Sequence, residues 1–149
     1  MKFWTHLVLA PTVSMACFCS AANAQGRFNR TIRVEVQATV NGQTVTAIPD
    51  AVRPHWFIEV KDWRKLSNRS QIQAEIAAGY AQGKRVAVIS TSRTQHYTPQ
   101  LRAALFERNG IILKRTGMSP SDTWEIMDLS AGTFSPIAKS VVTQILSNP

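Results

Sequence analysis

Apolar and polar side chains alternate along residues 32–40, with isoleucine and valine separated by charged, amide or hydroxyl residues. A period of two is typical of a strand with one buried face. Asn41 and Gly42 follow, and this dipeptide favours a tight hairpin turn because both residues accept a positive φ. We therefore predict a β-hairpin whose second strand covers residues 43–48 and is stopped by Pro49, which lacks a backbone donor.

The rest of the chain alternates between strand and helix patterns. Short apolar or β-branched runs predict strands over residues 55–61, 85–90 and 111–113, and an edge strand over 124–127. Spacings of three and four predict three helices. The first helix is capped by Ser67 or Asn68, has Ile72, Ile76 and Tyr80 as its apolar residues, and ends near Gly83. The second has Thr98 as its cap, Pro99 at its first position, and Leu101, Leu105 and Phe106 as its apolar residues. The third covers residues 137–146. This order predicts one α/β domain with a mixed sheet, the hairpin included, flanked by helices.

Residues 1–24 have the parts of a secretory signal peptide: a basic start, an apolar middle and a small-x-small end at Ala24. We expect cleavage there, export to the periplasm or the medium, and a single domain over residues 25–149. The alternative is a degenerate leader or the remnant of a longer precursor. Cys17 and Cys19 both lie in this segment, so the rest of the chain can form no disulfide or thiolate metal site. The apolar stretch is too interrupted for a membrane-spanning helix. We also expect no stable membrane insertion of the chain that remains after this segment is removed.

The chain is strongly basic, with a formal charge of +8 and a pI near 10.2 over 149 residues. Such an excess favours a polyanionic partner, either nucleic acid or an anionic membrane surface. A soluble basic protein without such a partner is the alternative, and charge alone does not choose between them.

Candidate chemistry centres on Asp50, Glu59 and Lys61. Glu59 and Lys61 are two residues apart in an expected strand and therefore project from the same face, where charges cost free energy unless they are paired or bind a metal. Two converging carboxylates suit Mg²⁺ or Mn²⁺, and a nearby lysine can position water and balance charge. Such a set predicts metal-dependent phosphodiester hydrolysis. The alternative is a turn aspartate beside a surface Glu–Lys pair of little energetic consequence.

The segments Pro49-Asp50 and Glu59-Val60-Lys61 resemble the PD-(D/E)xK motif of restriction-endonuclease-like nucleases. The run from Ile58 to Ser67, followed by Gln71, is similar to restriction-endonuclease-fold toxin domains of bacterial polymorphic toxins, and the similarity extends over roughly residues 46–115. The resemblance implies a restriction-endonuclease-like core and DNA cleavage with a divalent metal. It also implies that Asp50 and Glu59 bind the metal, that Lys61 is the catalytic lysine and that Gln71 lies beside them. A different alignment of the helix would put Gln73 there instead.

Basic residues follow the motif directly. Arg64, Lys65 and Arg69 are expected to hold phosphates, with a solvated loop as the alternative for each one. Trp63 is expected to pack against the following helix, and base stacking is its alternative role. His55 and His96 fall in no ligand spacing and are expected to be structural.

Three functions follow from these expectations. The first is a Mg²⁺-dependent endodeoxyribonuclease with little sequence preference. The second is an RNA-cleaving enzyme of the same fold, since the metal chemistry does not depend on the 2′-hydroxyl. The third is a non-catalytic exported protein that binds nucleic acid or anionic surfaces by charge. The resemblance further implies an exported antibacterial toxin with a cognate immunity protein as partner; no pattern in the sequence predicts an oligomeric state.

Overall fold

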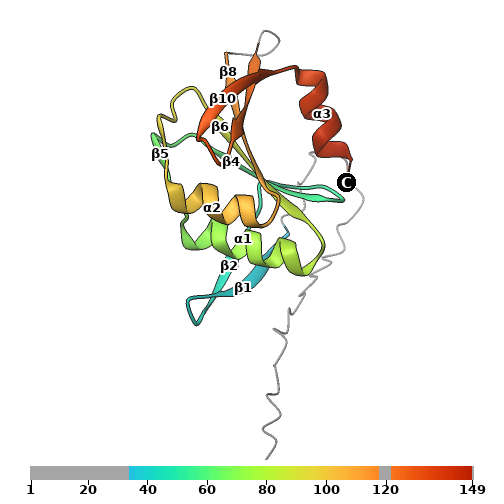
Figure 1. Ribbon diagram of the computed structural model, residues 1–149. Coiled ribbons are helices and arrows are strands. Elements are labelled where there is room, and N and C mark those ends of the chain that lie inside the picture. The colour runs from blue at the N-terminus through green and yellow to red at the C-terminus, as the bar shows by residue number, and fades with distance from the viewer. Residues whose placement is uncertain (1–33, 118–121, 149) are drawn as a thin grey trace, which may run out of the picture.

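A six-stranded mixed sheet forms the centre of the fold (Figure 1). Its middle three strands run parallel and are connected by two helices: β4 (Trp56–Lys61), α1 (Ser70–Ala81), β6 (Arg85–Thr91), α2 (Pro99–Glu107) and β8 (Ile111–Thr116). Antiparallel neighbours complete it, with β3 (Ala51–Val52) beside β4, and β9 (Thr123–Asp128) followed by β10 (Thr133–Ile137) beyond β8. The predicted α/β class, with a mixed sheet and flanking helices, is confirmed.

The computed structural model describes residues 34–117 and 122–148. The expected signal peptide over residues 1–24, with Cys17 and Cys19, lies outside these ranges. Within them, no helix is long and apolar enough to cross a membrane.

The hairpin forms as expected but does not join the central sheet. β1 (Val36–Val40) and β2 (Gln43–Ala47) pair through a turn in which Asn41 and Gly42 have φ of 50° and 78°. They make a separate two-stranded sheet that packs on α1. The expectation of a central sheet that includes the hairpin is therefore wrong. The hairpin buries its apolar face against the helix, and its strands do not pair with the central sheet.

Helix α1 consequently has neighbours on two sides, the sheet and the hairpin. Its N-cap is Arg69, and no side chain caps it, so the expected cap at Ser67 or Asn68 is wrong. Ile72 and Ile76 are buried as predicted, but Tyr80 is 62% exposed. Gly83 follows the helix with φ 68°, in agreement with the expected end of the helix.

Helix α2 follows its predicted start closely. Thr98 caps the helix through its side chain, which accepts a hydrogen bond from Leu101 N at 3.3 Å, and Pro99 occupies the first turn. Leu101 and Leu105 are fully buried, whereas Phe106 is 62% exposed, which corrects the predicted apolar stripe.

The C-terminal part contains one strand more than expected. The predicted edge strand over residues 124–127 is β9, and it lies inside the sheet between β8 and β10. The true edge is β10, where Pro136 is tolerated because an edge strand needs fewer backbone donors. A final helix, α3 (Lys139–Ser147), begins two residues later than predicted.

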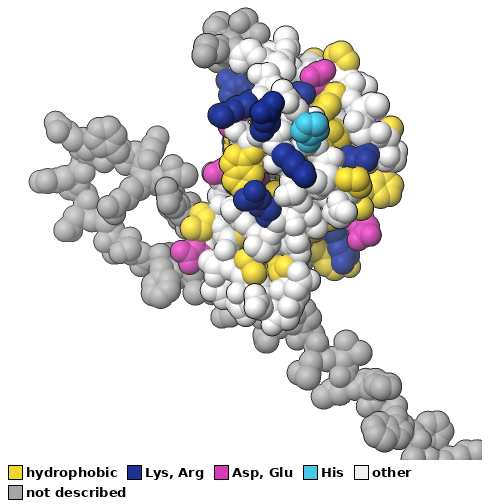
Figure 2. All heavy atoms as spheres, turned by 90° about the vertical axis from the view of Figure 1, so that its left-hand side faces the viewer, with side chains coloured by type: hydrophobic (Ala, Val, Ile, Leu, Met, Phe, Trp, Pro, Cys, Tyr) yellow, Lys and Arg dark blue, Asp and Glu magenta, His cyan; other side chains and the backbone are white. Residues whose placement is uncertain are grey.

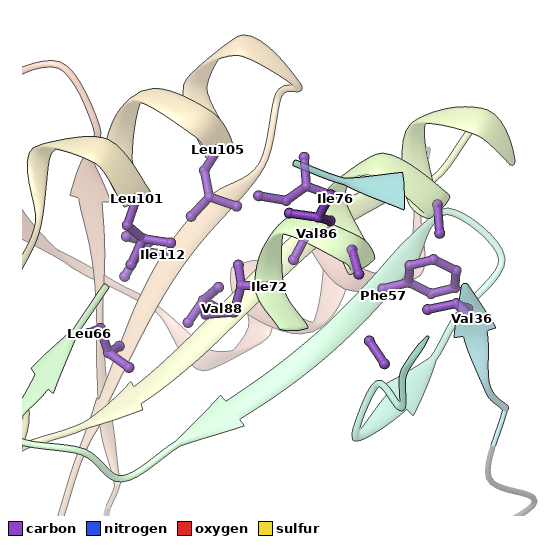
Figure 3. Close-up of a cluster of buried hydrophobic side chains, with 14 of the residues drawn as sticks. Val36, Phe57, Leu66, Ile72, Ile76, Val86, Val88, Leu101, Leu105 and Ile112 are labelled. Atoms are coloured by element: carbon purple, nitrogen blue, oxygen red, sulfur yellow. The ribbon is translucent and has the colours of Figure 1, made fainter. Parts of the chain in front are cut away.

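Two apolar clusters lie on opposite faces of the sheet. The larger one joins the sheet to α1, α2 and the hairpin and includes Phe57, Ile72 and Leu105 (Figure 3). The smaller one contains Trp56 and Ile58 beside residues of α3, and the Trp56 indole donates a hydrogen bond to a carbonyl of α3. β4 thus alternates between the two faces, which places Glu59 on the α1 side, near the end of the strand.

Candidate active site

Glu59 and Lys61 project from the last three residues of β4 on the α1 side of the sheet. Glu59 is fully buried, and its Oε1 forms an ion pair with Lys61 Nζ. The Lys61 side chain retains 13% exposure, so it lies near the boundary with solvent. Val60 between them is 49% exposed. The predicted alternation, and the placement of carboxylate and ammonium on one face, are confirmed.

Asp50 reaches the same place from the neighbouring strand. β3 pairs with β4 so that Ala51 lies opposite Ile58, and continuing this register by one residue places Asp50 opposite Glu59. Asp50 Oδ2 accepts a hydrogen bond from Val60 N at 2.7 Å. The Asp50 carboxylate therefore takes the place of a backbone acceptor where the ladder ends, and Asp50 itself is exposed.

Gln71, and not Gln73, faces this group. Gln71 Nε2 donates to Glu59 Oε1 at 2.9 Å, whereas Gln73 Nε2 donates to the Asn68 carbonyl at 2.7 Å. The two glutamines lie on opposite sides of the buried Ile72, since successive helix residues are rotated by about 100°. The structure thus decides between the two alternatives that the sequence left open.

A fourth charged residue, Glu75, was not predicted. It lies one helical turn after Gln71, is fully buried, and its Oε1 is 3.4 Å from Gln71 Nε2. Burial, followed by the charge of Glu59 and a hydrogen bond with it, raises the pKa of Glu75 to about 8 against the opposing effects of Gln71 and Lys61. The i, i+4 spacing from Gln71 was the only sequence signal, and the apolar residues around Glu75 obscured it.

Two carboxylate oxygens in this group have no hydrogen-bond partner among the described residues, namely Glu59 Oε2 and Glu75 Oε2, and both are buried. A protonated Glu75 carboxyl group can donate a hydrogen bond to the neighbouring Glu59 carboxylate, which an ionised one cannot. The raised pKa keeps this proton in place at neutral pH.

Asp50 and Glu59 are the residues of this group that could hold a small divalent cation. No group of three or more His, Cys, Asp or Glu residues in the described ranges is arranged to hold a metal, so an all-protein cage is absent there. Mg²⁺ normally takes only one or two carboxylates and completes its shell with water and substrate phosphate. Glu59 and the exposed carboxylate of Asp50 are the two acids that could form such a smaller donor set.

Basic side chains surround the strand ends that carry the site. Arg64, Lys65 and Arg69, together called the basic rim, are all exposed. Figure 2 shows Lys and Arg side chains gathered on this face of the molecule, the side of Figure 1 on which β5 (Lys65–Leu66) lies. Arg93 is also exposed and pairs with Asp62 at 3.6 Å. The arrangement presents positive charge beside Glu59 and Lys61.

Other basic residues and both histidines have different surroundings. Arg85 pairs with Trp56 at the start of the parallel strands, the end opposite to the site, and Lys84 donates to two backbone carbonyls there. At the end of β8, Arg115 forms an ion pair with Asp122 at 3.0 Å. His55 lies at the far end beside Arg85, and His96 is exposed in β7 (His96–Tyr97), next to Lys65.

Comparisons of the chain with protein-family models, with curated proteins and with solved structures each found no match.

Proposed function

We propose that the chain is a Mg²⁺- or Mn²⁺-dependent endonuclease that hydrolyses phosphodiester bonds of DNA, on a core of the restriction-endonuclease type. One observation carries the proposal: a fully buried Glu59 is held by Lys61 and Gln71, with Asp50 hydrogen-bonded to the next residue of the strand. Burying such groups costs free energy that packing does not return, and clusters of this kind concentrate at functional sites.

Each residue has a separate part in the proposed reaction. Asp50 and Glu59 would hold the cation, which when bound lowers the pKa of water and stabilises charge on the phosphate. Lys61 balances the charge of Glu59 and directs an N–H donor toward solvent at the scissile phosphate. Gln71 fixes the orientation of the Glu59 carboxylate by donating to Oε1, as hydrogen bonds to a metal ligand commonly do. The basic rim binds phosphates on either side without selecting a base sequence.

The test is cleavage of supercoiled plasmid by the purified chain with MgCl₂ or with EDTA. We expect nicking only with the metal, and a loss of about 100-fold or more in Glu59→Gln, since removing a metal ligand costs several kcal/mol of transition-state stabilisation. Glu107→Gln is the matched control, because Glu107 is exposed at the end of α2. Nicking that persists in EDTA, or is undiminished in Glu59→Gln, would refute the proposal.

The other functions expected from the sequence predict different experimental results. An RNA-cleaving enzyme would degrade a matched RNA in place of the plasmid, with the same dependence on Glu59. A non-catalytic binder would show salt-sensitive binding that Asp50→Asn leaves unchanged. Export, a role as an antibacterial toxin and a cognate immunity protein stay predictions of the sequence.

A further inference from the structure

Trp63 is a large aromatic side chain exposed to solvent beside the site. It follows Lys61 by two residues, and 38% of its surface is accessible. Lys61 Nζ lies 5.0 Å and the Arg69 guanidinium 4.6 Å from the centroid of its ring. Arg69 is the N-cap residue of α1, so Trp63 contacts the start of that helix, as expected. Cation–π contacts at exposed sites contribute too little to account for leaving more than a third of this side chain in water.

The backbone that carries Trp63 is held in place by a neighbouring segment. The Trp63 carbonyl accepts a hydrogen bond from Thr94 Oγ1 at 2.6 Å, and Thr94 is buried. The next carbonyl, of Arg64, accepts hydrogen bonds from the backbone N–H groups of Gln95 and His96. β5 then pairs in parallel with β7. The indole therefore projects from a backbone that neighbouring residues hold in place.

An exposed aromatic ring among cations is the arrangement by which proteins hold single-stranded nucleic acid, with bases stacked on the ring and phosphates on the cations. In a duplex the flat faces of the bases are already covered by their neighbours, so a fixed indole finds no free face. We propose that Trp63 is a stacking platform for one unpaired base and that the site prefers single-stranded nucleic acid to duplex. This inference rests on the proposed function for placing the scissile phosphate at Lys61.

Binding in EDTA tests the inference apart from cleavage. Fluorescence anisotropy would compare a short labelled DNA strand, its blunt duplex and the matching RNA strand on the full chain. Trp63→Ala should weaken binding of the single strands roughly 5- to 150-fold and leave the duplex within about twofold, because stacking is lost while phosphate contacts remain. Trp63→Phe should retain most of the affinity. Trp63→Leu should not, since it keeps apolar bulk but has no aromatic face.

Tyr80→Ala is the matched control. Tyr80 is 62% exposed and lies under the Arg108 guanidinium at 3.7 Å, but at the other end of α1 from Arg69. Equal losses for single strand and duplex, no loss in Trp63→Ala, full retention in Trp63→Leu, or an equal loss in Tyr80→Ala would each overturn the inference. A thermal melt of every variant confirms that it is folded, and Trp63→Leu carries the test if the alanine variant is not.

The two proposals fail in different ways. If Glu59-dependent cleavage is present but Trp63 has no effect on strand preference, the stacking role is wrong and the nuclease proposal stands. Trp63-dependent preference for single strands without metal-dependent cleavage would refute the nuclease and leave the stacking role in place.

Discussion

Glu75→Gln should be about as stable as the wild type at acid pH and increasingly more stable as the pH rises. Glu75 has an ordinary pKa of 4.5, and burial beside Glu59 raises the pKa to about 8 in the folded chain. Between these two values the folded state keeps a proton that the unfolded state has released. The free energy of unfolding therefore falls with increasing pH over this interval.

The size of the effect follows from the pKa difference. At 1.36 kcal/mol per pH unit, a rise from 4.5 to about 8 corresponds to a loss of about 5 kcal/mol at most by alkaline pH. This contribution is fully present below the unfolded pKa and is gone above the folded one. A glutamine has the same shape, donates a hydrogen bond to Glu59 as the protonated acid does, and does not titrate, so the variant escapes the loss.

Urea unfolding of wild type and Glu75→Gln at several values between about pH 5 and about pH 9 measures this difference. Subtracting one curve from the other removes the contribution of the titrating groups that do not interact with Glu75. We expect near-equal stability at the acid end and a growing advantage for the variant toward the alkaline end. Glu107→Gln, at an exposed position, should show no such trend. A difference that does not change with pH, or one that grows in favour of the wild type, would refute the assignment of the proton to Glu75.

Two further predictions concern the support of the site and of the core. Gln71→Ala should lower metal-dependent cleavage about 10- to 100-fold, because it removes the hydrogen bond that orients Glu59. Gln73→Ala removes a hydrogen bond to a loop carbonyl and should keep cleavage within about twofold of the wild type. Equal effects of the two variants would contradict the assignment of Gln71. Gly110→Ala should destabilise the fold by about 1–3 kcal/mol, because the added methyl group would lie 2.7 Å from Leu105 Cδ2 and 2.9 Å from the Val86 carbonyl oxygen. Urea unfolding measures this loss. An unchanged unfolding midpoint would show that the core accommodates the methyl group without loss of stability.

The site lies where the parallel strands end and α1 begins, which is where open α/β sheets commonly bind ligands. Glu59 and Lys61 come from the end of one strand, Asp50 from the start of its antiparallel neighbour, and Gln71 and Glu75 from the first turns of the helix that follows. The connection between strand and helix carries the basic rim and Trp63. A short stretch of chain therefore supplies both the buried acid and the charged surface around it.

Several of these features depend on local geometry alone, and the sequence was sufficient for them. Alternation along a strand puts Glu59 and Lys61 on one face whatever that strand packs against. The turn at Asn41-Gly42 and the cap at Thr98-Pro99 depend on the φ preferences and hydrogen-bonding groups of a few adjacent residues. The overall alternation of strand and helix likewise indicated an α/β domain with a mixed sheet.

Other features depend on which surfaces meet, and only the tertiary structure decided them. The hairpin could have extended the sheet or covered a helix, since its apolar face is equally buried in both cases; here it covers α1. Gln71 and Gln73 flank Ile72 symmetrically, so the rotation of α1 against β4 determined which glutamine binds Glu59. Glu75 became part of the site only because the packing of α1 against the sheet buries it. Asp50, Glu59 and Lys61 could be named from the sequence, but Glu75, whose pKa is raised by burial beside Glu59, lies where no local pattern predicts a buried acid.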